Sequence, residues 1–241
     1  MKNYIRILLL GVAALLTLGT LSACSSGTKE ATETTGSPET SETSAAPAPG
    51  TASPFPASAK YIADMKSADG KPMVIGIAVD GDEVAAYACN GVDDEAWFFG
   101  NQKDGKIGIT SRFKDTLTAE FNGKDVVGDL TMNGVAFKFS APAVPAPAGM
   151  YTADLDGVRA SWVVRPDGSA TGVQFNGGVS GRDFEQAELQ QLNEQQFRNA
   201  VRNKRQLQQA QQITLLANKS ARATINGTEV TPVLVNGNFR L

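Results

Sequence analysis

The clearest indication of the fold is the segment from Leu117 to Phe139, with the sequence LTAEFNGKDVVGDLTMNGVAFKF. Apolar and polar side chains alternate along much of it, and two Asn-Gly pairs, at 122–123 and 133–134, divide it into three runs. Alternation with a period of two is typical of a strand with one buried face, and Asn-Gly supplies the positive φ angles that a two-residue hairpin requires. The stretch therefore predicts three consecutive antiparallel strands.

The same pattern extends through most of the chain from Tyr61. Another alternating set comprises Met73, Ile75, Ile77 and Val79. Further Asp-Gly or Asn-Gly pairs fall at 80–81, 104–105, 156–157, 167–168, 226–227 and 236–237. Because these closely spaced turns leave no room for crossover helices, the sequence predicts a mainly β protein built from antiparallel meander or barrel-like β-modules.

A proline-rich connector at 141–149 separates two such modules. Its prolines cannot donate to a β-ladder, so we place the boundary there, with module 1 at 59–144 and module 2 at 145–241. The pattern of 121–137, with its two Asn-Gly pairs, resembles that of 225–239, where the interval between the two asparagines is one residue shorter. Two interpretations are open: a duplicated module, or the general likeness of hairpins that use Asn-Gly turns.

One segment departs from the β pattern. Residues 183–217 contain no Gly or Pro, are rich in Gln, and carry apolar side chains at roughly helical spacing, from Leu189 to Ile213. We expect one long Gln-rich helix near the C-terminus, or two helices with a break near Asn203, with Asp183 as the N-cap and Gln186 completing a capping box. The helix either packs on the sheet or protrudes to bind a partner, and drift from a strict heptad favours packing.

Four basic residues of this segment are expected to form a solvated face: Arg198, Arg202, Lys204 and Arg205.

The N-terminus carries an export signal. Lys2 and Arg6 precede a short apolar stretch, and Leu21-Ser22-Ala23-Cys24 matches the bacterial lipobox. This arrangement predicts a signal peptide at 1–23 and a diacylglyceryl group on Cys24. Since each buried methylene contributes about 0.8 kcal/mol, two acyl chains would hold the protein on the extracytoplasmic face of the cell membrane. The alternative is an ordinary secretory signal that ends near a cysteine.

Residues 24–58 follow the signal peptide and are dominated by Ser, Thr, Ala, Pro, Gly and Glu. Such a composition cannot bury enough apolar surface to offset the entropy of ordering. We expect a disordered tether that holds the folded part away from the membrane.

The composition excludes several chemistries. Histidine is absent and cysteine occurs only at positions 24 and 89, so Ser-His-Asp, Cys-His and His/Cys zinc sites cannot form within the chain. The net charge of −3 gives no basic field for nucleic acid. We therefore expect a protein that is not an enzyme, with no catalytic residue, metal or cofactor and no nucleic acid partner.

Weak site candidates gather around one strand, at Cys89, Asp93, Asp94, Glu95 and Trp97. Without a histidine to activate it, Cys89 is expected to behave as a small buried hydrophobe rather than a reactive thiol. Trp97 is expected in the core. A calcium site would require the acidic groups at 80–83 and 93–95 to meet at one end of the sheet, whereas acidic turn residues are the simpler explanation.

Several short motifs carry a resemblance, at 86–91 (AYACNG), 95–100 (EAWFFG), 137–139 (FKF) and 147–151 (PAGMY). Within about 73–175 the chain resembles uncharacterised exported proteins and lipoproteins of actinobacteria. The resemblance implies a β-rich extracytoplasmic domain with no assigned activity, and it supplies no catalytic residue.

Two functions are consistent with these features. The first is a non-enzymatic role in the cell envelope, structural or in binding a lipid, a glycan or a protein; one variant is a barrel whose apolar interior holds a lipid. The second is a carboxylate-dependent hydrolase acting on envelope glycans, with Asp94 or Glu95 beside Trp97. It would need two facing carboxylates in a cleft, roughly 5 to 10 Å apart.

Replacing Cys24 tests the anchor. The variant Cys24→Ala is expected to lose all labelling by a metabolic fatty-acid probe, because only this thiol can receive the diacylglyceryl group, whereas Cys89→Ala should remain labelled. Label that persists on Cys24→Ala would refute the lipid anchor.

Overall fold

A computed structural model describes residues 52–241, which belong to one compact unit. The predicted signal peptide, Cys24 and the tether as far as residue 51 lie outside the described residues, so the expectations about them remain predictions. Within 52–241 no helix combines the length and the apolar character needed to cross a membrane.

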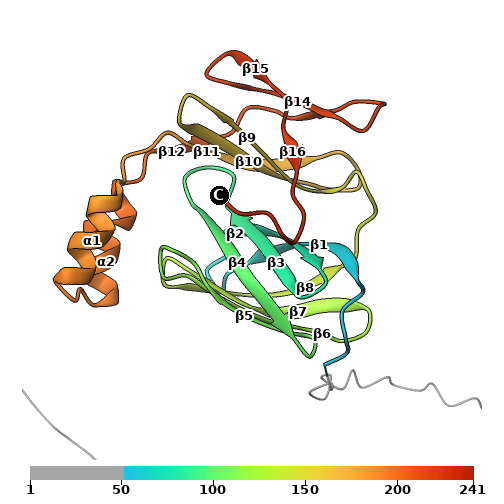
Figure 1. The fold of residues 1–241 in the computed structure, drawn as a ribbon, viewed down its shortest axis with the longest axis horizontal. Coiled ribbons are helices and arrows are strands. Elements are labelled where there is room, and N and C mark those ends of the chain that lie inside the picture. Colours follow the sequence, from blue (N-terminus) through green and yellow to red (C-terminus); the bar gives the residue numbers. More distant parts are fainter. Residues whose placement is uncertain (1–51) are drawn as a thin grey trace, which may run out of the picture. The chain divides into compact units, whose positions relative to one another are not determined.

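Eight antiparallel strands in simple chain order form the first sheet (Figure 1). They are β1 Ser58–Lys66, β2 Pro72–Asp80, β3 Glu83–Cys89, β4 Glu95–Lys103, β5 Lys106–Thr110, β6 Thr116–Phe121, β7 Asp125–Met132 and β8 Val135–Pro142. The turns Asp104-Gly105 and Asn133-Gly134 have positive φ at both residues, as two-residue hairpins need. The predicted antiparallel meander is confirmed.

The sheet curls into a nearly closed barrel. Its first and last strands meet through a bridge between Tyr61 and Ala143, and the Val144 N–H donates to the Lys60 carbonyl at 2.8 Å. The interior is filled by buried side chains from all eight strands, among them Ile75, Phe98, Leu117 and Leu130. The predicted alternating sets therefore line the inside of the barrel.

One side of the barrel is covered by a second sheet, and the other side is exposed to solvent. Strands β5, β6 and β8 alternate between buried and exposed residues, whereas β2 and β3 are buried almost throughout. Burial on both faces arises because the outer surface of β1–β4 packs on a second sheet through residues such as Tyr87 and Val163. Gly76 permits the close approach, since a Cβ there would lie 2.4 Å from Met150 Cγ.

The second sheet has five strands in the order β12-β11-β10-β9-β16. They are β9 Gly149–Leu155, β10 Val158–Val164, β11 Ala170–Phe175, β12 Leu207–Gln209 and β16 Val233–Leu234. Its other face packs on a three-stranded sheet of β13 Thr214–Leu215, β14 Ala221–Ile225 and β15 Thr228–Val230. Trp162, Ile213 and Ile225 belong to the apolar cluster between these two sheets. The barrel, the second sheet and the small sheet thus form successive layers (Figure 1).

The predicted module boundary remains a prediction, although the strand layout changes there. The barrel ends at Pro142 and the second sheet begins at Gly149, with the connector between them. The two parts share the cluster that contains Tyr87 and Val163.

The expectation of one long Gln-rich helix at 183–217 is wrong. Two short helices are present instead, α1 Gly181–Leu189 and α2 Glu194–Ala200, followed by the 3-10 turn η1 Arg202–Lys204. Leu207–Gln209 then leaves the helical path to pair with the free edge of β11. Helix propensity and apolar spacing favour a helix here. Pairing with a sheet edge overrides them, and local sequence does not encode that pairing.

Helix capping also differs from expectation. Ser180 is the N-cap of α1, and Asp183 sits at the third helical position, where its carboxylate accepts from the Ser180 backbone N–H at 2.8 Å. The break between the helices lies before Asn193, whose side chain accepts from the Gln196 N–H at 2.9 Å and so starts α2. Asn203, where a break was expected, lies within the 3-10 turn η1.

The second copy of the Asn-Gly spacing has a different structure from the first. Asn226-Gly227 joins β14 to β15 as a hairpin, but Asn236-Gly237 follows the last strand and does not adopt positive φ. The Gly237 N–H donates instead to the Asp80 carboxylate at 2.7 Å. The observed geometry favours the likeness of hairpins over duplication of a module.

The chain enters the barrel through a fixed segment at its lower end. The Ser53 N–H donates to the Phe121 carbonyl at 2.7 Å, and the Phe55 ring stacks on Phe121 with 5.1 Å between ring centres. Gly105 accommodates this segment, since a Cβ there would clash with the Ser53 backbone. Ser53 and Phe55, which lie within the predicted tether, therefore contact the barrel.

Phe55 should stabilise the barrel although it precedes the first strand. We expect Phe55→Ala to lower the free energy of unfolding by about 2 kcal/mol, roughly half the cost for a fully buried phenylalanine. Urea denaturation followed by tryptophan fluorescence measures this, with Val92→Ala, at a 58% exposed position, as the control. Equal stability of Phe55→Ala and wild type would show that the segment does not close the barrel end.

Candidate functional site

Two clefts open near the end of the barrel where β3 passes into β4. The barrel-mouth cleft, about 680 Å³, is lined by Lys71, Met73, Asp93, Asp94, Phe137 and Arg202 among others. The aromatic cleft, about 430 Å³, has walls from the barrel, the second sheet and α1, including Trp97, Phe99, Phe113, Phe175 and Phe184. Arg205 lines both clefts, so the side chains around it form the partition between them.

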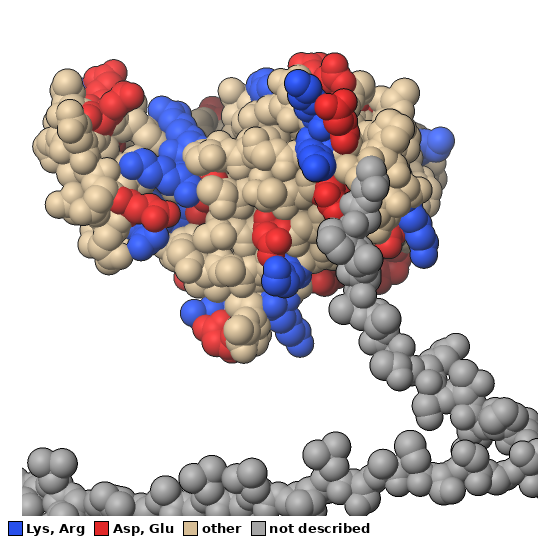
Figure 2. Space-filling view, turned by 90° about the horizontal axis from the view of Figure 1, so that it is seen from below, with Lys and Arg blue, Asp and Glu red and all other residues tan. Residues whose placement is uncertain are grey.

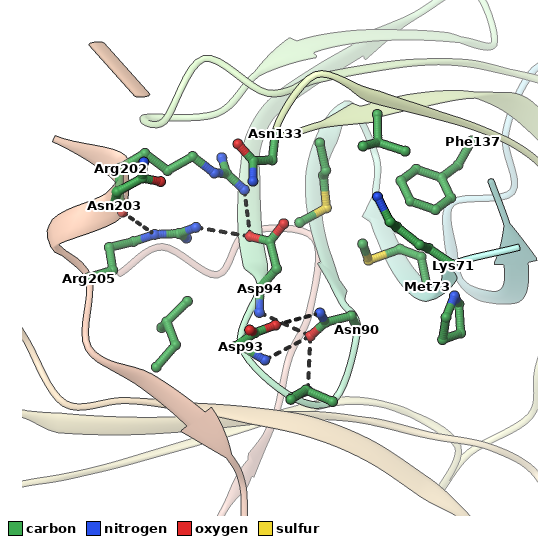
Figure 3. A pocket seen from close by; sticks show the side chains of 15 residues that line it. Lys71, Met73, Asn90, Asp93, Asp94, Asn133, Phe137, Arg202, Asn203 and Arg205 are labelled. Carbon is green, nitrogen blue, oxygen red and sulfur yellow. Dashed lines mark hydrogen bonds and ion pairs between the residues drawn. The ribbon is translucent and has the colours of Figure 1, made fainter. Parts of the chain in front are cut away.

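The β3–β4 loop is folded by Asn90. Its side-chain oxygen accepts from the backbone N–H groups of Val92, Asp93 and Asp94 at 2.9 to 3.0 Å. Gly91 has a φ of +75°, which a glycine adopts without strain. This local geometry directs the Asp94 carboxylate toward the arginines of η1 and the residue after it (Figure 3).

Arg202 joins three loops through buried ion pairs. Its two terminal nitrogens donate to Asp94 at 2.6 Å and to Asp115 at 2.5 Å, and its side chain is only 1% exposed. Asp115 also accepts from the Asn133 backbone N–H at 3.0 Å and from the Ser111 hydroxyl at 3.0 Å. The β3–β4, β5–β6 and β7–β8 loops are therefore tied to the helical segment through one guanidinium.

Arg205 completes the partition. It donates to Asp94 at 2.9 Å and to the Glu95 carbonyl at 2.6 Å, and its guanidinium lies 4.5 Å from the centre of the Phe113 ring. Burial lowers the pKa of Arg205, and the positive charge of Arg202 lowers it further, while Asp94 opposes both. Burial would also lower the pKa of Arg202, but Asp94 and Asp115 outweigh it and raise that pKa.

Glu95 forms the charged floor of the aromatic cleft. It is 2% exposed, pairs with Arg159, and accepts from the Tyr87 hydroxyl at 3.0 Å. Burial raises the pKa of Tyr87 well above its ordinary value, and neighbouring Cys89 and Glu95 raise it further, so Tyr87 stays a neutral donor to Glu95.

The walls of the aromatic cleft are half-buried rings. Phe113 and Phe184 pack with 5.5 Å between ring centres, and Trp97 stacks on Phe99 at 5.5 Å. The Arg112 guanidinium lies 3.9 Å from the centre of the Phe184 ring. Arg112 is exposed and forms no ion pair or side-chain hydrogen bond with any residue of 52–241.

The structure divides the five predicted candidates between these places. Asp93 and Asp94 line the barrel-mouth cleft, whereas Glu95 and Trp97 line the aromatic cleft. Cys89 is fully buried against the second sheet, and burial raises the pKa of its thiol to about 12. It packs as a small apolar residue.

The two acidic groups at 80–83 and 93–95 do not meet. They lie at opposite ends of β3, which separates them by roughly 20 Å at about 3.3 Å per residue. Residues 52–241 hold no cluster of three or more acidic or cysteine side chains with the spacing of a metal site.

Sequence reasoning missed the arginines and Asp115. Arg202 and Arg205, expected on a solvated face, are buried and paired. Their partners lie 87 to 111 residues away along the chain, so no local pattern marks them. The basic cluster in the sequence was the only indication of these residues, and it predicted exposed side chains where the structure has buried ones. Over the face seen in Figure 2, basic and acidic side chains are interspersed rather than gathered by sign.

Comparison with protein-family models, with curated proteins and with solved structures finds no match for this chain.

Removing Arg202 should be costly because the buried carboxylate of Asp115 would lose its guanidinium partner, and Asp94 would keep only its pair with Arg205. We expect Arg202→Met to lower the free energy of unfolding by about 3–5 kcal/mol. The control Arg222→Met breaks an exposed pair with Glu229 at 3.3 Å and should change the free energy of unfolding by less than about 0.5 kcal/mol. Urea denaturation measures both, and a similar small loss in each would show that the Arg202 network does not stabilise the fold.

Proposed function

We propose that this chain is an exported lipoprotein of the cell envelope, anchored through Cys24, whose folded part binds a ligand in the aromatic cleft without catalysing a reaction. The anchor and the address rest on the lipobox, and the resemblance to actinobacterial exported lipoproteins agrees with them. The ligand-binding role rests on one observation: a concave surface walled by half-buried aromatic rings from three parts of the fold.

Half-buried rings in a cleft favour binding because they leave apolar area that a ligand can cover. Phe99, Phe113, Phe175 and Phe184 all keep partly exposed rings there. The volume of about 430 Å³ lies in the lower part of the range common for small-molecule sites.

The cleft replaces the barrel interior as the expected lipid site. Interior side chains such as Phe98 and Leu130 are completely buried and pack against each other. A lipid between the strands would have to displace this core, at the cost of its packing. The cleft offers apolar surface without that cost.

Binding is also favoured over the hydrolase alternative. Asp94 is held by two arginines, Glu95 by Arg159 and Tyr87, and Asp93 by the Asn90 amide at 2.9 Å. A catalytic carboxylate must be able to reach the substrate, whereas these carboxylates are already engaged by protein partners. The cleft-lining carboxylates therefore lack the free, facing pair that glycoside hydrolysis requires.

The test is native mass spectrometry of the chain purified from its own envelope. We expect wild type to carry a bound small molecule and Phe184→Ala to lose it, because a wall of the cleft is removed. The control Leu189→Ala changes the same helix at a position that is 84% exposed and outside the cleft, so it should keep the molecule.

Wild type without any bound molecule, or equal retention by Phe184→Ala, would contradict a binding role for this cleft. Thermal unfolding of both variants would establish that they are folded.

A further inference from the structure

We propose, resting on the function above, that the ligand of the aromatic cleft is an amphipathic anion. Its apolar tail lies against the aromatic walls, and its carboxylate or phosphate headgroup is bound by Arg112 at the rim. The proposal follows from the distribution of charge, the position of Arg112 and the chemistry of the walls.

Among the arginine side chains that line the aromatic cleft, Arg112 has no ion-pair partner within residues 52–241. Three arginines line the cleft, but Asp94 neutralises Arg205 and Glu95 neutralises Arg159. Arg112 has no acidic partner among residues 52–241. The barrel-mouth cleft has no comparable free cation, since Lys71 lies 2.9 Å from the Asp69 carboxylate and both of its arginines are paired. The unpaired side chain of Arg112 therefore favours an anionic group at its side of the aromatic cleft.

Arg112 is well placed to hold that anion. Its guanidinium lies on the face of Phe184, which orients the planar group and leaves its N–H donors unused by residues 52–241. An arginine held by an aromatic ring and carrying free donors can bind carboxylate or phosphate through two parallel hydrogen bonds. The ring therefore supplies part of the ordering that an isolated surface arginine lacks.

The exposure of the lining side chains decreases from the rim to the bottom of the cleft, and this indicates how the ligand is oriented. Arg112 is exposed at the rim, whereas Trp97 is 7% exposed deeper in the cleft. Below the rings, Glu95 already has Arg159 and Tyr87 as partners, so the floor offers no unpaired charge to a headgroup. The anionic end therefore belongs at the rim and the tail on the rings.

Of the two hydroxyl side chains that line the cleft, Thr110 and Ser111, the second is already used by the protein. The Ser111 hydroxyl donates to Asp115 and accepts from the backbone N–H groups of Phe113 and Asp115 at 3.0 to 3.1 Å. A neutral sugar would therefore place many of its hydroxyls against aromatic rings, which favours a ligand with an apolar tail instead.

Isothermal titration calorimetry tests the headgroup and the tail separately. All the groups used here lie in the compact unit that includes 52–241, so the mature chain from Ser25 can be titrated without its predicted anchor. The probes are decanoate, decyl phosphate, decanol and acetate. We expect both decyl anions to bind, decanol to bind at least about tenfold more weakly, and acetate to show no binding.

Two variants connect the result to Arg112. Arg112→Gln should weaken both decyl anions by about tenfold and leave decanol unchanged, because only the charged contact is lost. The matched control Arg182→Gln removes an exposed arginine of α1 that does not line the cleft and should change nothing.

Equal binding of decanoate and decanol, equal losses in the two variants, or no binding of any decyl probe would overturn the proposal. These outcomes are distinct from failure of the proposed function. A bound molecule that Phe184→Ala releases, together with no decanoate binding, would keep the cleft as a binding site and refute only the amphipathic anion.

Discussion

The ion pairs of Arg202 with Asp94 and Asp115 connect the helical segment to the loops at one end of the barrel. A buried guanidinium is tolerable only because two carboxylates surround it, and each carboxylate is itself fixed by its loop. The helical segment also contacts the barrel through the apolar cluster of Phe113, Phe184 and Phe197, and the ion pairs add a fixed link at the partition between the clefts. Because both clefts are bounded by these elements, their shape follows from this ionic contact.

A second constraint is that only half of the barrel is covered. The second sheet packs on β1–β4, and the helices pack near the open end through Phe113, Phe184 and Phe197. The aromatic cleft lies where the barrel, the second sheet and α1 meet without filling the space between them. Such junctions are common places for ligand sites, since a rigid scaffold holds the walls apart. Here the packed barrel interior serves as that scaffold.

The distribution of charge separates structural from available groups. Arg202, Arg205 and Arg159 have carboxylate partners that stabilise the fold, whereas Arg112 lies on an aromatic ring and its donors are not used by residues 52–241. Burial and pairing thus assign most ionisable groups near the clefts to stability. This distribution supports the proposed role in ligand recognition.

The meander, its turns and the inward set of apolar residues could be predicted from the sequence, because period-two alternation and Asn-Gly turns are local properties of the chain. The absence of histidine likewise excludes histidine chemistry, and the lipobox predicts the lipid anchor. The division of 183–217 into two helices and strands could not be predicted, since it depends on the free edge of β11, which pairs with Leu207–Gln209. The burial of Arg202 and Arg205 also depends on the folded chain, because their acidic partners are distant in sequence and meet them only when the barrel has formed.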